Sequence, residues 1–267
     1  MIRVTILGCG SSGGVPRIGG NWGACDPANP KNRRRRCSIL IDRIGGEGMT
    51  RVLVDTGPDM VAQLLDTDVR VLDAVIWTHA HADHVHGIDD LRQLAYNARA
   101  RVQGHADAPT RAALLDRFGY IFERPEGSHY PPICDLHPLE GPLRIEGAGG
   151  AIDITPFAVP HGEIEALGLK IATAAGGIVY LPDVQTIPET AWRVIGRPEI
   201  FICDALRHDP HPSHAHLALT LDWLARSGTA RGVLTNMHID MDHAAIHAET
   251  PANVAPAHDG MVLEAAP

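Results

Sequence analysis

One short stretch decides the fold of this chain: Thr78-His79-Ala80-His81-Ala82-Asp83-His84. Three imidazoles and one carboxylate fall within six residues, directly after the apolar run at residues 72–77. Neutral imidazole and carboxylate are the preferred protein ligands of zinc, manganese and iron. Few structural needs would place so many titratable groups at the end of a buried strand. The stretch therefore predicts the core of a site that holds two metal ions.

The stretch supplies ligands for both ions but cannot complete either set. His79 and His81 are two residues apart, so an extended loop lets both bind one metal from the same side. Asp83 and His84 follow where the chain begins to turn, and they point to a second position. Because a catalytic site uses about three protein ligands and leaves one position open, further donors must come from elsewhere in the chain.

Three further candidate ligands each follow a segment that is typical of a strand. They are His161 after residues 155–160, Asp183 after residues 178–182 and His238 after residues 233–237. In layered α/β proteins the functional groups gather on loops at one edge of the sheets. This placement favours the three side chains as the missing ligands.

Predicted strands and helices are interspersed along the chain. We expect strands at residues 4–7, 38–42, 51–54, 72–78, 152–159, 168–172, 178–181, 200–203 and 232–235, and helices at residues 60–65, 88–98, 109–118 and 216–226. Residues 123–138 contain several Pro and Gly and are expected to be loop. With no low-complexity linker and no visible repeat, the pattern favours a single α/β layered domain over residues 1–267.

Composition limits the classes of partner. The net charge of −9 argues against a broad nucleic-acid interface, although bound dications could still attract an anionic substrate. No apolar run approaches the ~18–20 residues of a membrane span, and the first residues are typical of a strand and not of a signal peptide. Five scattered cysteines without a Cys-x-x-Cys pair argue against disulfides. We therefore expect a cytoplasmic protein with neither a membrane nor a nucleic-acid partner.

The ordered set of candidate ligands resembles the metallo-β-lactamase superfamily. His-x-His-x-Asp-His is followed in order by His161, Asp183 and His238, and Asp55-Thr56-Gly57 matches that superfamily's early strand-end Asp. Three segments more specifically resemble the PhnP-type phosphodiesterases of the phosphonate-degradation (carbon–phosphorus lyase) pathway: Gly8-Cys9-Gly10-Ser11-Ser12-Gly13-Gly14-Val15-Pro16, His86-Gly87-Ile88-Asp89-Asp90-Leu91-Arg92 and Asp259-Gly260-Met261. The resemblance spans nearly the whole chain and implies a four-layer αββα sandwich, the metallo-β-lactamase fold.

The resemblance also implies a division of the ligands between two divalent ions. The first ion would be bound by His79, His81 and His161, and the second by Asp83, His84 and His238, with Asp183 bridging them. A hydroxide between the ions would be the nucleophile, which places Asp83 among the candidate catalytic residues as well. Asp55 would orient a ligand imidazole from behind through a hydrogen bond.

A histidine on a loop before a helix is the acid that the resemblance implies for the departing oxygen. His214 fits by its Pro-x-His context, and His216 remains the alternative. Histidine suits this role because its pKa lies near neutral. Candidate substrate-binding residues are Arg92 and Tyr96, one helical turn apart after the metal stretch, and His129 in the long loop.

One feature of the PhnP type is missing from this chain. Those proteins have a structural zinc held by a Cys cluster in the early loop and by a late His. Here only Cys25 stands in that loop, and Met241 is the residue three positions past His238. We therefore expect no structural zinc.

Together these patterns predict a metal-dependent hydrolase that cleaves small phosphodiesters, such as cyclic phosphates of sugars or nucleotides. Its two ions would be zinc or manganese, with iron also compatible, and a homodimer is left open. One alternative is a transfer-RNA 3′-processing endoribonuclease of the same superfamily, although residues 123–138 lack the basic cluster expected of its RNA-binding arm. Another is a non-catalytic metal-binding or carrier protein on this fold, which predicts lost ligands. Thioester or lactam hydrolysis is a weaker option, since a fold alone does not fix the chemistry.

Overall fold

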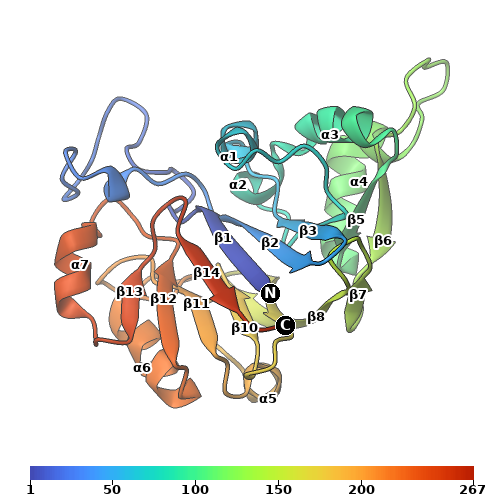
Figure 1. Ribbon diagram of the computed structural model, residues 1–267. Coiled ribbons are helices and arrows are strands. Elements are labelled where there is room, and N and C mark those ends of the chain that lie inside the picture. Colours follow the sequence, from blue (N-terminus) through green and yellow to red (C-terminus); the bar gives the residue numbers. More distant parts are fainter.

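Two seven-stranded sheets form the centre of the structure, a computed structural model that describes residues 1–267 (Figure 1). The first sheet runs in the order β14 (Val262–Ala265), β1 (Ile2–Gly8), β2 (Ser38–Gly45), β3 (Gly48–Val54), β4 (Ala74–Ile76), β5 (Val102–Ala106) and β6 (Cys134–Pro138). The second runs in the order β13 (Val254–Pro256), β12 (Arg231–Thr235), β11 (Ile200–Asp204), β10 (Ile178–Leu181), β9 (Ile164–Ile171), β8 (Ile152–His161) and β7 (Leu143–Ile145).

Helices cover the outer face of each sheet. The helices α1 (Met60–Asp66), α2 (Ala82–Val85), α3 (Leu91–Ala98) and α4 (Ala108–Phe122) lie on the first sheet, and α5 (Glu189–Ile195), α6 (Leu217–Ser227) and α7 (His243–Glu249) lie on the second. Short 3-10 turns occur at Pro30–Asn32 and Ile88–Asp90. The predicted αββα sandwich is therefore confirmed. None of the helices combines the length and the apolar character that crossing a bilayer needs.

Alternation along the strands explains the layers. In β2, Ile39 and Ile41 belong to the apolar cluster between the sheets, whereas Leu40 belongs to the cluster under the helices of the first sheet. Successive side chains of a strand point to opposite faces, so a strand that is covered on both sides must be apolar at every position. The 47 buried residues of the first cluster join both sheets and α5–α7 into one core.

Most predicted elements are confirmed with ends that differ by a few residues. The loop predicted at residues 123–138 was wrong at its end, because β6 pairs in parallel with β5, placing Cys134 opposite Val102. Pro138 obscured this strand, but proline is tolerated on an edge strand, where no partner needs its missing N–H. The prediction also lacked β5, β7, β13, β14, α5 and α7, which are short segments without a clear period.

Close backbone contacts hold the metal stretch against the edge of the first sheet. The Thr56 amide donates to the His84 carbonyl oxygen at 2.8 Å, and the Gly87 amide donates to the Thr56 carbonyl oxygen at 2.7 Å. A Cβ atom at Gly57 would lie only 2.3 Å from the Asp83 carbonyl oxygen. Glycine at this position therefore allows Asp83 and His84 to approach the end of β3.

Replacing Gly57 with Ala should lower the stability of the protein. The new methyl group would overlap the Asp83 carbonyl oxygen, and overpacking of this kind costs about 1–3 kcal/mol. Urea denaturation followed by circular dichroism measures the loss. Gly46→Ala is the matched control, because a Cβ atom there meets no heavy atom within 4 Å. Equal midpoints for the two variants would contradict this account of the loop.

Candidate metal centre

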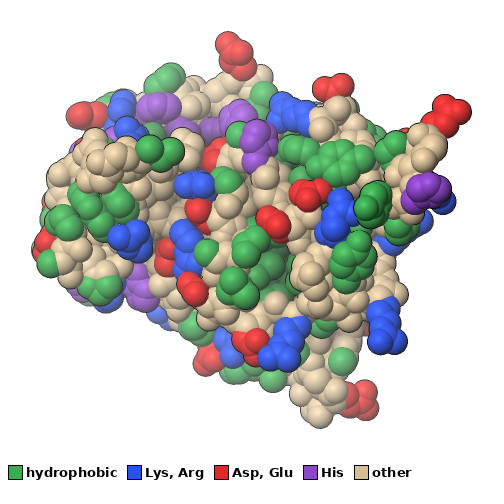
Figure 2. Space-filling view, turned by 90° about the horizontal axis from the view of Figure 1, so that it is seen from above, with side chains coloured by type: hydrophobic (Ala, Val, Ile, Leu, Met, Phe, Trp, Pro, Cys, Tyr) green, Lys and Arg blue, Asp and Glu red, His purple; other side chains and the backbone are tan.

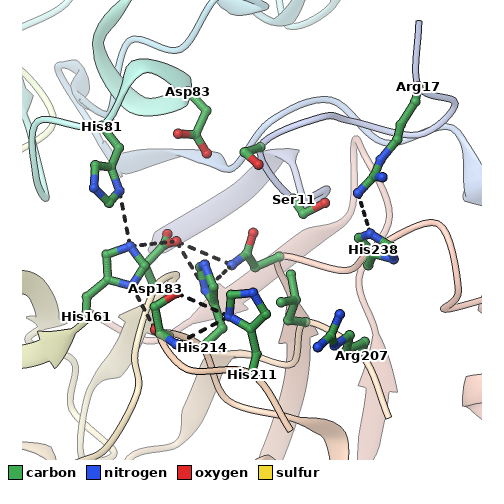
Figure 3. Close-up of a pocket in the computed structure, with 14 residues that line it drawn as sticks. Ser11, Arg17, His81, Asp83, His161, Asp183, Arg207, His211, His214 and His238 are labelled. Carbon is green, nitrogen blue, oxygen red and sulfur yellow. Dashed lines mark hydrogen bonds and ion pairs between the residues drawn. The ribbon is translucent and has the colours of Figure 1, made fainter. Parts of the chain in front are cut away.

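A polar cavity of about 380 Å³ lies where the strand ends of the two sheets meet (Figure 3). Among its fourteen lining residues only Leu206 is hydrophobic. His161 is the last residue of β8, Asp183 follows β10, and Asp204 ends β11. Seen from above, several histidine side chains gather on this face of the molecule (Figure 2). The expected convergence of strand-end donors at one edge is therefore present.

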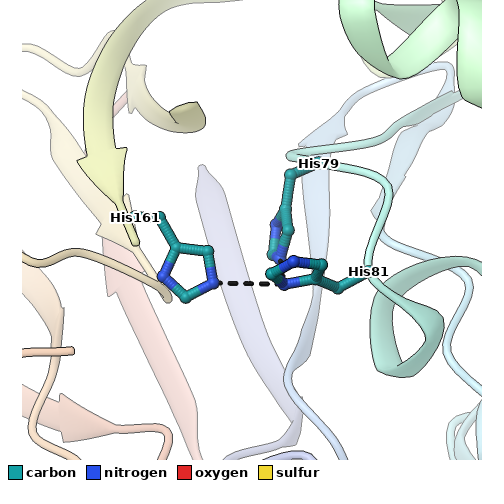
Figure 4. Close-up of side chains that lie close together, drawn as sticks. All are labelled: His79, His81 and His161. Carbon is teal, nitrogen blue, oxygen red and sulfur yellow. Dashed lines mark hydrogen bonds between the residues drawn. The ribbon is translucent and has the colours of Figure 1, made fainter. Parts of the chain in front are cut away.

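Three imidazoles form the first part of the site (Figure 4). His81 Nδ1 lies 3.1 Å from His79 Nε2 and 3.2 Å from His161 Nε2. His161 Nδ1 donates to the Ser213 carbonyl oxygen at 2.9 Å, so its Nε2 has a lone pair to offer. Burial lowers the pKa of all three rings, which favours the neutral form that binds metals. The structure thus brings together the three histidines predicted for the first ion.

Asp183 links this trio to a second group. Its Oδ2 lies 3.1 Å from His84 Nε2, and its Oδ1 lies 3.8 Å from His161 Nε2. Asp83 Oδ2 is 3.5 Å from the same nitrogen of His84. Asp183 therefore has the position between two groups of donors that the prediction assigned to a bridging carboxylate.

Asp55 lies behind His84, as predicted. Its carboxylate accepts a hydrogen bond from the Thr78 amide at 2.8 Å and one from His84 Nδ1 at 2.8 Å. The backbone of Asp55 has a φ of 65°, which is uncommon for residues other than glycine, and the residue is fully buried. Because Asp55 accepts a hydrogen bond from His84 Nδ1, the ring presents Nε2 on the side of Asp183, where it can bind a metal.

The electrostatics of the cluster fit a divalent cation. Burial lowers the pKa of His84, but the charges of Asp183, Asp55 and Asp83 outweigh it and raise that pKa well above its ordinary value. The carboxylates therefore favour positive charge beside His84 Nε2. His84 Nε2 and Asp183 Oδ2 are both buried and lie 3.1 Å apart, yet neither makes a hydrogen bond. The donor atoms of His79, His84 and Asp183 all lie within 4.8 Å of one another, which is close enough to share an ion.

His238 departs from the predicted ligand set. It lines the cavity on the side opposite His81 and His161 (Figure 3). Its Nδ1 donates to Asp240 Oδ2 at 2.7 Å, and its Nε2 contacts Arg17 Nη2. The structure does not bring His238 into the cluster with Asp83 and His84. The Arg17 guanidinium lies at His238 Nε2, the nitrogen that a metal would bind.

The structure distinguishes between the two candidate acids, His214 and His216. His214 lines the cavity, and its Nδ1 donates to Asp204 Oδ2 at 2.9 Å. Burial lowers the pKa of His214, but Asp204 together with Asp183 and Asp83 raises it to about 9. His216 is the residue before the first turn of α6 and does not line the cavity. The structure therefore favours His214.

Sequence reasoning missed several residues of the cavity and also Asp204, which bonds to His214 from behind. Asp204 could have been found, because it ends a predicted strand just as Asp183 follows one. Asn236, with a φ of 59°, donates its amide to Asp204 Oδ1 at 3.2 Å. Its contact with His214 Nδ1 is not a hydrogen bond, since that nitrogen donates to Asp204. The lining also includes Ser11, Ser12, Arg17, Arg207, His211 and Ser213.

The three candidate substrate-binding residues do not line the cavity. The inward face of α3 is occupied by Leu91, Leu94 and Ala95, so Arg92 and Tyr96 point away from the sheet. Arg92 pairs with Asp89, Tyr96 is 55% exposed, and His129 is exposed in the projecting loop after α4 (Figure 1). The helical spacing was correct, but it placed these side chains on the solvent face.

Cys25, the remaining cysteine of the early loop, packs in a small apolar cluster with Val15 and Ile239. All five cysteines of the chain are free and buried.

Comparisons with known proteins agree with this geometry. Residues 50–239 match the family model described as the beta-lactamase superfamily domain. A crystal structure of a diphosphatase from the PhnP family superposes with a TM-score of 0.87 at 31% identity, covering 99% of this chain and 98% of that one.

Two curated relatives are more distant. An octanoyltransferase of Porphyromonas gingivalis is 28% identical over 97% of this chain, which spans only 51% of that relative. A ribonuclease Z of Bradyrhizobium diazoefficiens is 24% identical over 78% of this chain and 85% of the relative. The match over residues 50–239 and the likeness to the PhnP-family structure lead to one conclusion: this chain belongs to the metallo-β-lactamase superfamily.

Proposed function

We propose that this protein is a metal-dependent hydrolase of small phosphodiesters. The observation that supports this most is the bridging position of Asp183, which lies 3.1 Å from His84 and 3.8 Å from His161. The likeness to a PhnP-family diphosphatase supports a phosphoryl substrate. Cyclic phosphates of sugars or nucleotides and diphosphate diesters all fit this class.

Two divalent ions are part of the proposal. His79, His81 and His161 would hold one, and Asp83 with His84 would hold the other, with Asp183 between them. Zinc, manganese and iron all accept this mixture of imidazole and carboxylate. When bound, the ions would neutralise phosphoryl charge and lower the pKa of a water molecule. His238 would join the second ion if its contact with Arg17 is released.

The chain's own residues account for the proton that hydrolysis must deliver. Adding water across a P–O bond releases one proton from the attacking water and requires one at the departing oxygen. Asp204 and the nearby carboxylates raise the pKa of His214 to about 9, which favours the protonated ring as the source of that proton. Because His214 Nδ1–H is hydrogen-bonded to Asp204, we assign the donation of the proton to the departing oxygen to His214 Nε2.

A ribonuclease of the same superfamily is the second candidate, and the ribonuclease Z relative favours keeping it. The exposed loop after α4 has one arginine, Arg124, and no lysine between residues 123 and 133, and the chain has a net charge of −9. These features weigh against a phosphate backbone as ligand. A gel shift with a transfer-RNA precursor separates the two: binding at submicromolar protein concentration and physiological salt would favour the ribonuclease.

A non-catalytic carrier on this fold, and hydrolysis of thioesters or lactams, remain weaker alternatives. All the predicted ligands are retained in the chain. Turnover of a phosphodiester by the metal-loaded protein would exclude the carrier.

Replacing Asp183 with Ala should reduce the hydrolysis of bis(p-nitrophenyl) phosphate by more than about 100-fold. Loss of a residue that only hydrogen-bonds a metal ligand already reduces metal affinity or activity by about 10–100-fold. Asp183 contacts both groups of donors directly, so its loss should cost more. Release of p-nitrophenolate is the readout. Asp222→Ala removes an exposed carboxylate on α6 and should leave the rate unchanged. Retained activity in D183A would refute the shared-carboxylate scheme.

Replacing His214 with Gln should have an effect that depends on the leaving group. An alkyl diester needs a proton at its departing oxygen, so its kcat should fall by roughly 10²–10⁴-fold. The hydrolysis of bis(p-nitrophenyl) phosphate should fall far less, since p-nitrophenolate departs as a stable anion. His216→Gln is the control and should change neither rate. Equal losses for both substrates in H214Q would count against an acid at this position.

A further inference from the structure

One part of the cavity wall contains none of the proposed ligands. This part comes from the loop after β1 and the loop after β11, and it includes Ser11, Arg17 and Arg207. The carboxylates that line the cavity, Asp83 and Asp183, both belong to the ligand cluster. The remaining wall is neutral or cationic, so it suits an anionic group of the substrate.

Two polar atoms in this wall lack partners within the protein. Ser11 is only 4% exposed, yet its Oγ has no hydrogen-bond partner. Arg17 Nε is also buried without a partner, although the same guanidinium contacts His238 through Nη2. Figure 3 shows the Ser11 hydroxyl pointing to the side of the cavity where Arg17 and His238 lie. Buried polar groups are nearly always satisfied, so an unpaired hydroxyl beside an unpaired guanidinium nitrogen indicates a missing acceptor.

Arg207 lies on the same side of the cavity (Figure 3), and its guanidinium bonds to carbonyl oxygens of its own loop. Its Nε donates to the Asp209 carbonyl oxygen at 3.2 Å, and its Nη2 donates to the Pro210 carbonyl oxygen at 3.0 Å. These bonds fix the guanidinium and leave Nη1 without a protein partner. A guanidinium matches the geometry of phosphate oxygens, and such charge-assisted bonds are about twice as strong as neutral ones.

From these contacts we infer that Ser11, Arg17 and Arg207 form a second anion subsite beside the metal centre, which binds a phosphoryl group other than the one attacked. The substrate would therefore contain two phosphoryl groups, as a diphosphate diester does. This inference rests on the proposed function and narrows it. Binding of the second phosphoryl group would also draw Arg17 from His238, freeing the Nε2 of that ring.

Kinetics with two substrates tests the subsite. ADP-ribose, a diphosphate diester, has the second phosphoryl group, and bis(p-nitrophenyl) phosphate lacks it. In Arg17→Gln and Arg207→Gln we expect kcat/KM for ADP-ribose to fall at least tenfold more than kcat/KM for bis(p-nitrophenyl) phosphate, mainly through KM. Ser11→Ala should show the same selectivity with a smaller loss. Arg33→Gln removes an exposed guanidinium outside the cavity and should change neither value.

The outcomes separate this inference from the proposed function. Equal losses on both substrates in R17Q, or no loss on ADP-ribose, would overturn the subsite while leaving the phosphodiesterase intact. If the wild-type protein turns over neither compound, the proposed function fails and calorimetric titration with ADP-ribose decides the subsite. A Kd that rises at least tenfold in R17Q and R207Q supports the subsite. A Kd that is the same in the variants as in the wild type, or a wild type that does not bind ADP-ribose, overturns it.

Discussion

A buried carboxylate oxygen that lacks a hydrogen-bond donor is the constraint on which this site depends. Asp183 is 3% exposed, its Oδ2 has no hydrogen-bond partner, and further carboxylates lie close by at Asp83 and Asp55. Transferring such charge out of water is costly unless it is paired. Without an ion, the carboxylates favour protons on His84 and His214, whose pKa values they raise, whereas burial disfavours the charged form of His79 and His161. A divalent cation can replace those protons, since it compensates the carboxylates and accepts the lone pairs of neutral rings.

The fold orients two of the ligand rings through hydrogen bonds to the nitrogen that faces away from the site. Asp55 accepts a hydrogen bond from His84 Nδ1, and the Ser213 carbonyl oxygen accepts one from His161 Nδ1. His161, Asp55 and Ser213 lie at strand ends or on loops that follow strands, and His84 lies in the short helix α2. Gly57 adds a steric condition, because only a residue without a Cβ lets the Asp83 loop close against β3. Ligand geometry is therefore set by main-chain packing as much as by the ligands.

The sequence alone predicted the features that depend on local order. The stretch from His79 to His84 and the strand-end positions of His161 and Asp183 follow from spacing and apolar runs, and the structure brings them together. The opposite wall depends on contacts that spacing does not reveal. Ser11 is placed by the bond from its amide to the Met237 carbonyl oxygen at 3.3 Å, across more than 200 residues. Arg92 and Tyr96 failed as substrate residues for a related reason: helical spacing gives a shared face but not its direction.

The central claim is that this chain binds two dications in one shared cluster. Metal analysis by inductively coupled plasma mass spectrometry, on protein supplied with zinc or manganese and then dialysed extensively, tests it most directly. The account predicts about two tightly bound ions per chain. Protein that retains fewer than one ion per chain would contradict it, because the buried carboxylates would then be balanced by protons alone.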